Sequence, residues 1–437
     1  MRRALGTMLL AGCAMAEPTC SPVTARPVIE GPPASDPIWR EDYTQPDWRP
    51  PEFGSEVVDA IPCPSYAVVR PLCSPDVAAL AGGVGYPTVQ DAIDGAEPDE
   101  TVFVCAGSHP GPLRIEGRTL ALRAVDSGQT TLFSRQVGPI VTLVDADVWI
   151  EGVGIEGGES LTGAAGLDAS RSRVRVRCSS VRANVGFESA AGGIGLHASS
   201  LLLHTSRVLR NRASRAWGIV GTGEDGPLDL ILVRSQFEGP GGGSRYTPAV
   251  QLTGREVRLQ IRSTRFADEG AGEVGPGIRV EAAAVSVDIE DSVFENHRAD
   301  ETQMGAALWL VGSDVDLGVR GSEFVANDSA VAAGAIGVEA ERANVFFFDT
   351  QLDDNAAPDA AAMLVEGSES TVLELRGGTL FRNRAGPGGA AIELPGDSTL
   401  VLQGAVLGSG IDDNVEHELA IGDEFIDGSG VTTLRRP

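Results

Sequence analysis

The chain has 437 residues and a formal net charge of −27, with 61 acidic side chains against 34 basic ones. This balance disfavours nucleic acid or an anionic membrane surface as a partner, because like charges repel. Gly is abundant, at 55 residues, and aromatic residues make up only 5% of the chain. Such a composition favours many turns around a narrow aliphatic core.

The first residues are typical of an export signal. Two arginines precede an apolar run over residues 4–10, which is too short to span a bilayer. The run leads into Leu10-Ala11-Gly12-Cys13, which resembles the lipobox of bacterial lipoproteins. This resemblance implies a signal peptide over residues 1–12, acylation of Cys13 and stable anchoring through the acyl chains. The alternative is an ordinary secretory signal with an incidental cysteine.

The segment after the cysteine predicts a tether. Residues 13–57 are rich in proline and show no sustained periodicity, which indicates a disordered, extended linker. Ala14 follows the cysteine, which resembles the pattern of lipoproteins that Gram-negative bacteria send to the outer membrane. We therefore expect a lipid-anchored protein of the bacterial cell envelope, located in the outer membrane.

The remaining cysteines are compatible with disulfides, because an exported protein meets an oxidising environment. Cys63 and Cys73 enclose a short loop within the cysteine-containing segment 58–85, and we predict that they pair with each other. Cys178 ends a predicted strand on the same face as two valines, so we expect a buried free thiol there. The spacing of cysteines and histidines fits no zinc site, and no metal is predicted.

Residues 86–437 are predicted to form the folded body. Val89 and Ile93 lie four residues apart, which predicts a short helix ending near Gly95, before a strand over Thr101–Cys105. This order of helix, acidic turn, strand and Gly-rich corner resembles the entry into the right-handed parallel β-helix of pectin-lyase-like proteins. The resemblance implies that the helix caps the first coil, whose edge would otherwise expose unpaired backbone groups.

A unit of about 28 residues then recurs down the chain. In the copy at residues 305–327, alternating apolar residues predict three short strands, at Leu308/Leu310, at Val315 to Val319 and at Phe324. The corners between them are too short for helical crossovers. We therefore expect each strand to pair in parallel with its equivalent one coil later.

Two columns of apolar residues align the copies. The first strand of each coil carries an inward pair: Leu167/Ala169, Ile194/Leu196, Ile219/Gly221, Val250/Leu252, Ile278/Val280, Leu308/Leu310, Ile336/Val338, Met363/Val365 and Ile392/Leu394. The third strand has its own column: Val181, Val208, Phe237, Phe266, Phe294, Phe324, Leu352 and Phe381. Two columns that keep the same irregular spacing predict an all-β solenoid of about ten coils. Together with the resemblance, this is a right-handed parallel β-helix with a short N-terminal capping helix.

A turn residue follows the third-strand column in each coil: Asn184, Asn211, Gly239, Asp268, Asn296, Asn327, Asn355 or Asn383. These residue types tolerate the left-handed conformation, and we expect their side chains to form a ladder between coils. The small-small-apolar entry of each coil, such as GGAAI at 388–392, also resembles the repeats of chlamydial-type polymorphic outer-membrane proteins. That likeness reports coil geometry rather than activity.

The outward face of the first strands holds the candidate ligand site. Glu339 and Glu366 are expected to lie opposite each other, with Cβ atoms about 5 Å apart, and Arg279, Glu281 and Trp309 follow on the same face. Stacked carboxylates are able to bind Ca²⁺ weakly or to act as an acid/base pair, and Trp309 is able to stack on a sugar. The resemblance to pectin-lyase-like enzymes implies an active site on the comparable face. The alternative is a solvated acidic row that protects the sheet from aggregation.

Other candidates lack a complete catalytic signature. Asp353-Asp354 and Asp412-Asp413 resemble the Asp pair of polygalacturonases, but the companion motifs of that family are missing. Arginines 173, 175 and 177 leave one face of a strand, and we expect salt bridges to acidic neighbours. Five histidines have no Ser or Cys partner in a recognisable frame and are expected to be exposed: His109, His197, His204, His297 and His417.

We therefore expect a non-enzymatic cell-envelope lipoprotein, monomeric, whose β-helix surface serves adhesion or the binding of carbohydrate or an envelope protein. The membrane is a partner through the lipid anchor, and no cofactor is predicted beyond weak Ca²⁺. The alternative is a polysaccharide lyase or hydrolase that acts on the first-sheet face.

Overall fold

The computed structural model describes Cys63 and residues 73–436, except 188–190, 225, 241–246, 268–276, 300–303, 388, 396–397, 408–416, 422–423 and 427–429. The predicted signal peptide, Cys13 and the tether lie outside the described residues, as do Asp268, Asp412 and Asp413. Within the described ranges, no helix is both long and apolar enough to cross a membrane.

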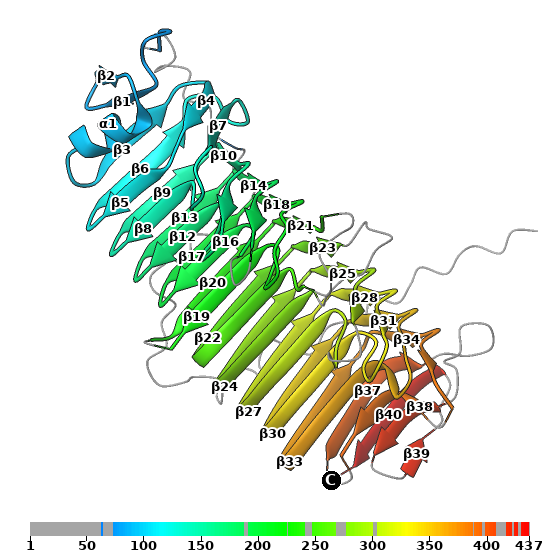
Figure 1. The fold of residues 1–437 in the computed structure, drawn as a ribbon. Coiled ribbons are helices and arrows are strands. Elements are labelled where there is room, and N and C mark those ends of the chain that lie inside the picture. Colours follow the sequence, from blue (N-terminus) through cyan, green and yellow to red (C-terminus); the bar gives the residue numbers. More distant parts are fainter. Residues whose placement is uncertain are drawn as a thin grey trace, which may run out of the picture. The chain divides into compact units, whose positions relative to one another are not determined.

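The described chain winds into a parallel β-solenoid of about ten coils, as predicted (Figure 1). Each strand pairs with its equivalent one coil later. For example, β13 (Arg173–Arg177) lies between β9 (Asp147–Glu151) and β17 (Ser200–His204) and is parallel to both. Three rows of strands result, and we call them the first, second and third sheets.

The first sheet begins with short strands: β5 (Leu113–Glu116), β8 (Val141–Val144), β12 (Leu167–Ser170), β16 (Ile194–His197) and β19 (Ile219–Gly223). The second sheet begins with β3 (Glu100–Val104), β6 (Thr119–Ala124), β9, β13, β17 and β20 (Leu228–Val233). The third sheet holds β4 (Gly107–Pro110), β7 (Thr130–Phe133), β10 (Val153–Glu156), β14 (Ser180–Arg182), β18 (Arg207–Leu209), β21 (Gln236–Glu238), β23 (Arg265–Ala267), β25 (Val293–Glu295), β28 (Glu323–Val325), β31 (Gln351–Asp353) and β34 (Thr379–Phe381).

In the later coils the first two strands merge, so the prediction of three short strands per coil is wrong there. The merged strands are β22 (Val250–Arg262), β24 (Ile278–Glu290), β27 (Leu308–Arg320), β30 (Ile336–Phe348) and β33 (Ala360–Arg376). In the earlier coils, Asp145, Arg171 and Ala198 turn this corner with φ between 47° and 49°. The merged strands pair almost without interruption through the corner, so the backbone bends there and does not turn.

A helix covers the N-terminal end of the solenoid. The predicted capping helix is present as α1 (Val89–Gly95), and Val89 and Ile93 are buried against the first coil. The Arg118 guanidinium donates hydrogen bonds to the carbonyl oxygens of Ile93 and Ala96 at the end of α1, at 2.8 and 3.1 Å. The short strands β1 (Ala79–Ala81) and β2 (Val84–Tyr86) lie beside the helix.

The last coils contain β36 (Ala390–Leu394), β37 (Thr399–Leu407) and β38 (His417–Ile421). Antiparallel partners pair with two of them: β39 (Glu424–Ile426) with β38, and β40 (Gly430–Arg436) with β37. Short strands that follow the third-sheet strand of a coil also pair between coils: β11 (Glu159–Ser160), β15 (Val185–Gly186), β26 (Arg298–Ala299), β29 (Asp328–Ser329), β32 (Ala356–Ala357) and β35 (Arg384–Ala385).

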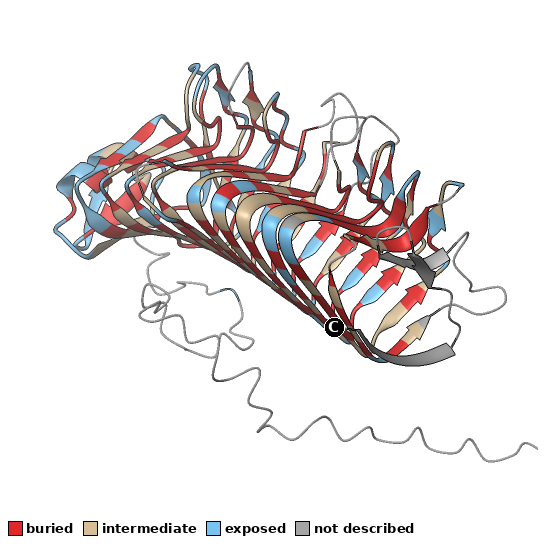
Figure 2. Ribbon diagram, turned by 90° about the horizontal axis from the view of Figure 1, so that it is seen from below, coloured by how far each residue is buried: buried red, intermediate tan, exposed pale blue. Residues whose placement is uncertain are grey.

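The core includes the predicted columns together with the inward residues of the second sheet, and buried and exposed residues alternate along the strands (Figure 2). Phe237, Phe266, Phe294 and Phe324 stack in successive coils with ring centroids 4.5, 4.8 and 4.8 Å apart. The final member of the third-strand column differs from the prediction. Leu380, and not Phe381, is the partner of Leu352, because β34 is shifted by one residue from the expected alignment.

A ladder of buried asparagines does join the coils. Both the backbone N–H and the Nδ2 of Asn355 donate to Oδ1 of Asn383, each at 3.1 Å, and Asn327 makes the same pair of bonds to Asn355. The asparagines that form these bonds are not left-handed, however. The residue before each one has positive φ, as Ala326 does at 56° and Asp354 at 56°.

This offset moves one predicted member of the ladder. Asn296 is the left-handed residue of its coil, with φ of 61°, and His297 takes the ladder position. The backbone N–H of His297 donates to Oδ1 of Asn327 at 3.1 Å. The ladder position therefore requires a residue that hydrogen-bonds between coils. The left-handed backbone conformation is required of the residue before it.

The predicted disulfide between Cys63 and Cys73 is wrong. Cys63 pairs with Cys178, and Cys73 pairs with Cys105. Cys178 is therefore not a free thiol. Cys63 and Cys73 are ten residues apart in the chain, and the two disulfides attach them to two different coils. A disulfide between Cys63 and Cys73 would attach neither of them to a coil.

Candidate functional site

The register of the predicted first-sheet face is confirmed. Glu339 on β30 lies directly opposite Glu366 on β33, and Arg279 on β24 lies opposite Trp309 on β27. Glu281 lies two residues after Arg279 and pairs with it across 3.2 Å. The alternation of inward and outward residues was therefore sufficient to place these five side chains on one face.

Trp309 is not solvent-facing, in contrast to the prediction. Its side chain projects from the outer face of the sheet, but only 7% of the residue is exposed. The guanidinium carbon of Arg279 lies 4.2 Å from the centre of the indole ring, and Nε1 donates to Oε1 of Glu339 at 2.8 Å. A sugar would have to displace Arg279 to stack on this face of the indole.

The carboxylates of this face are crowded. Burial, followed by the charges of Glu339 and Asp359, raises the pKa of Glu366. The pKa of Glu393 is also raised, by burial and then by Asp359 and Glu366. Within the described part of the chain, no group of three or more His, Cys, Asp or Glu side chains is arranged to hold a metal ion. The face thus offers a carboxyl that retains its proton to higher pH next to a second carboxylate.

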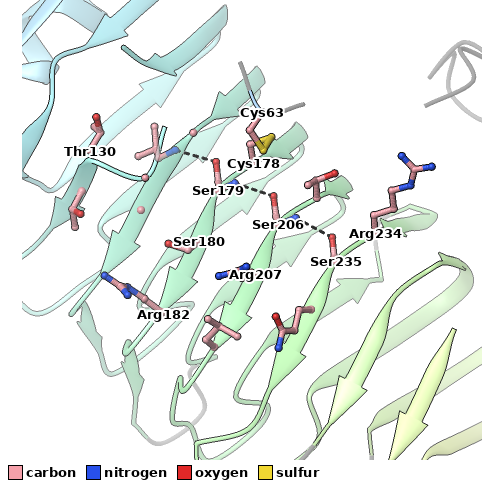
Figure 3. A pocket seen from close by; sticks show the side chains of 18 residues that line it. Cys63, Thr130, Cys178, Ser179, Ser180, Arg182, Ser206, Arg207, Arg234 and Ser235 are labelled. Carbon is pink, nitrogen blue, oxygen red and sulfur yellow. Dashed lines mark hydrogen bonds between the residues drawn. A yellow bond between two sulfur atoms is a disulfide. The ribbon is translucent and has the colours of Figure 1, made fainter. Parts of the chain in front are cut away.

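A second candidate lies on the third sheet, where sequence reasoning had placed none. A groove of about 520 Å³ crosses β7, β10, β14, β18 and β21 beside the Cys63–Cys178 disulfide (Figure 3). Its described lining is rich in hydroxyl groups and includes Arg182, Arg207 and Arg234, and it contains no carboxylate. We call it the third-sheet groove.

Small side chains make the groove hollow. Thr131, Gly154 and Ser180 occupy the same outward position on three successive strands, before Arg207 and Gln236 continue the row. A Cβ added to Gly154 would lie 3.3 Å from the Thr131 hydroxyl and 3.4 Å from that of Ser180. The outward side chains are therefore small over three coils, and the hollow that they leave ends at the larger side chain of Arg207.

The back of the groove is built from a second ladder, of hydroxyl groups. The backbone N–H groups of Val153, Ser179 and Ser206 each donate to the hydroxyl one coil later, on Ser179, Ser206 and Ser235 (Figure 3). These hydroxyls are buried and already bonded, so they stabilise the corner. The half-buried Ser180 and Gln236 and the exposed Arg207 are the groups that a ligand would meet.

The groove has a signal in the sequence that lies outside the inward columns. Its outward residues stand one position before the third-strand column, so Ser180 precedes Val181 and Arg207 precedes Val208. Reading that offset down the chain would have shown the run of small residues. The contribution of Cys63 could not be read in this way, because it depends on the disulfide.

The remaining predicted residues have structural roles. Arg173 and Arg175 pair with Asp147, and Arg177 pairs with Glu151, as predicted. Asp353 accepts a hydrogen bond from the backbone N–H of Phe381, and Asp354 pairs with Arg382. The expectation of exposed histidines is wrong for three of them, because His109, His204 and His297 are buried.

Comparison with known proteins adds no relative. No protein-family model matches the chain, and no significant match exists among curated proteins or among solved structures. The resemblance to pectin-lyase-like proteins therefore stays a prediction beyond the β-helix itself.

Proposed function

We propose that this protein is a lipid-anchored component of the bacterial cell envelope that binds carbohydrate on its β-helix body without cleaving it. The observation that supports binding is the third-sheet groove, which is large enough for a small oligosaccharide. Its accessible hydroxyl, amide and guanidinium groups are the kind that hydrogen-bond to sugars. Adhesion to the envelope or to a surface polysaccharide would follow from such binding.

The lipid anchor is supported by the lipobox at Leu10–Cys13 and by the Pro-rich residues 13–57. Cells that express the full chain should incorporate labelled palmitate into it. The Cys13→Ala variant should lose the label and leave the membrane fraction. Label that persists in this variant would refute the anchor.

Binding is tested on the purified body with a panel of neutral and acidic oligosaccharides. The Ser180→Trp variant places a large ring in the hollow part of the groove, and it should lose the binding that the wild-type protein shows. Thr253→Trp is the matched control, because Thr253 is an outward strand residue on the first sheet. Binding that survives Ser180→Trp but is lost in Thr253→Trp would move the site to the first sheet.

A second candidate function is polysaccharide hydrolysis or lysis on the first-sheet face. The observation that favours it is the raised pKa of Glu366 directly opposite Glu339, since such pairs divide acid and base roles. The same panel should then show turnover, and the turnover should disappear in Glu366→Gln and Glu339→Gln. Glu281→Gln is the control on the same face. Binding without turnover would contradict this candidate.

A further inference from the structure

Three side chains on adjacent coils of the first sheet form a chain of contacts that the proposed function does not use. Oγ1 of Thr222 on β19 lies 3.0 Å from Nδ1 of His197 on β16. Nε2 of the same imidazole lies 3.3 Å from Oδ1 of Asp168 on β12. A hydroxyl, an imidazole and a carboxylate are thus connected in series.

The fold brings these residues together through register and one glycine. His197 and Thr222 are direct partners across neighbouring strands, with side chains on the outer face. Asp168 lies opposite Gly195, so its carboxylate reaches His197 diagonally. A Cβ at Gly195 would lie 2.5 Å from Oδ1 of Asp168, so the contact depends on the missing side chain.

The arrangement selects one tautomer of the imidazole. The Asp168 carboxylate lies next to Nε2 and therefore favours the proton of neutral His197 on that nitrogen. Nδ1 then keeps a lone pair that faces the Thr222 hydroxyl, which lies within hydrogen-bonding distance of both Nδ1, at 3.0 Å, and the Leu196 carbonyl oxygen, at 3.4 Å. The contact with Asp168 is also the largest cause of the raised pKa of His197, and burial and the charge of Arg215 oppose it.

We propose that Thr222 is a nucleophile that takes an acyl group from esters, with His197 as its general base and Asp168 as a positioning residue. A hydroxyl next to a base that a third group orients is the arrangement that activates such nucleophiles. His197 retains 43% of its side-chain exposure, so reagents reach the imidazole from solvent. The proposal does not depend on the third-sheet groove.

The reaction balances with these groups alone. Thr222 Oγ1 attacks the ester carbonyl while its proton moves to Nδ1 of His197, and the alkoxide leaves with that proton as the C–O bond breaks. Asp168 stabilises the imidazolium that forms in between. Water then hydrolyses the acyl-threonine by the same route, which regenerates the hydroxyl.

The test uses the purified full chain and p-nitrophenyl acetate as a generic ester. We expect release of p-nitrophenol above the buffer rate and a mass increase of one acetyl group, located on the peptide that contains Thr222. Thr222→Ala should abolish both signals, whereas Thr222→Ser should retain them. His197→Ala should lower the rate about a hundredfold. Thr253→Ala removes a neighbouring hydroxyl and should leave the rate unchanged.

The role of Asp168 is read from the pH profile. The rate should rise as His197 loses its proton, at a pH above the ordinary histidine value of 6.5, because the carboxylate raises its pKa. In Asp168→Asn this rise should move to lower pH while the maximum rate falls. Acetylation that is spread over other hydroxyls, or a rate that Thr222→Ala does not change, would overturn the proposal. An unmoved pH profile in Asp168→Asn would remove Asp168 from it.

Discussion

The indole Nε1 of Trp309 donates a hydrogen bond of 2.8 Å to Oε1 of Glu339 on the next coil. On the other side, the Arg279 guanidinium covers the indole ring. Three residues that the sequence suggested as separate ligand groups are thus bonded to one another. Because these groups are already in contact with one another, they are less available to a ligand. For this reason we propose carbohydrate binding on the third sheet.

Replacing Trp309 with Phe should test the stack. The change keeps a buried ring but leaves the Glu339 carboxylate without its indole donor, so the free energy of unfolding should fall by about 1–2 kcal/mol. Urea denaturation measures the change. Glu281→Gln breaks a more exposed ion pair on the same face and should change the stability by less than about 1 kcal/mol. Equal effects of the two substitutions would contradict the account.

The buried His297 should make the protein less stable in mild acid. Burial lowers the pKa of His297 to about 4, below the ordinary histidine value of 6.5. The folded state therefore favours the neutral ring, and the stabilisation is complete above pH 6.5 and lost as the pH falls towards 4. The loss attributable to this group is about 3 kcal/mol.

Comparison of the wild-type protein with His297→Asn isolates this group. Asparagine occupies the equivalent position in the following coils and does not titrate. The unfolding free energy of the variant should fall less between neutral pH and pH 4 than that of the wild type. Identical pH profiles would show that His297 is not buried as described.

The asparagine ladder should be sensitive at its middle rung. Oδ1 of Asn355 accepts from the backbone N–H and Nδ2 of Asn327, and its own Nδ2 donates to Asn383. Asn355→Ala leaves buried donors unpaired and should lower the unfolding free energy by about 3 kcal/mol. Asn344→Ala removes an exposed hydrogen bond to Asp316 and should stay within about 0.5 kcal/mol of the wild type. A small effect at both positions would contradict the ladder.

The Cys63–Cys178 disulfide should be directly visible in a peptide map under non-reducing conditions. Digestion should yield one linked pair containing Cys63 with Cys178 and another containing Cys73 with Cys105. The first bond closes a separation of 115 residues, and its removal in the Cys63→Ala/Cys178→Ala double variant should lower stability by about 5 kcal/mol on the chain-entropy model. A linked Cys63–Cys73 peptide would contradict the structure.

The columns of the core could be predicted because every second residue of a strand is buried, and the sequence shows this as an alternation of apolar and polar residues. Leu308, Leu310 and Phe324 each have equivalents in neighbouring coils, and the structure stacks them as expected. Prediction failed where a single position decides the outcome. Asparagine is suited both to the left-handed position and to the ladder position that follows it. In this coil Asn296 takes the left-handed position and His297 takes the ladder position.

Features that depend on contacts between distant segments could not be read from the pattern. The pairing of Cys63 depends on which coil its segment meets, and residue spacing alone favoured the shorter loop. The burial of Trp309 depends on the side-chain conformation of Arg279, which strand alternation does not determine. The contact between Asp168 and His197 depends on the empty space above Gly195.

The most direct test of carbohydrate binding is a crystal structure of the protein with whichever oligosaccharide binds in the panel. Electron density for the sugar is expected along β14, β18 and β21, in contact with Ser180 and Arg207. Density on the first-sheet face beside Glu339 and Glu366, with the third-sheet groove empty, would contradict it.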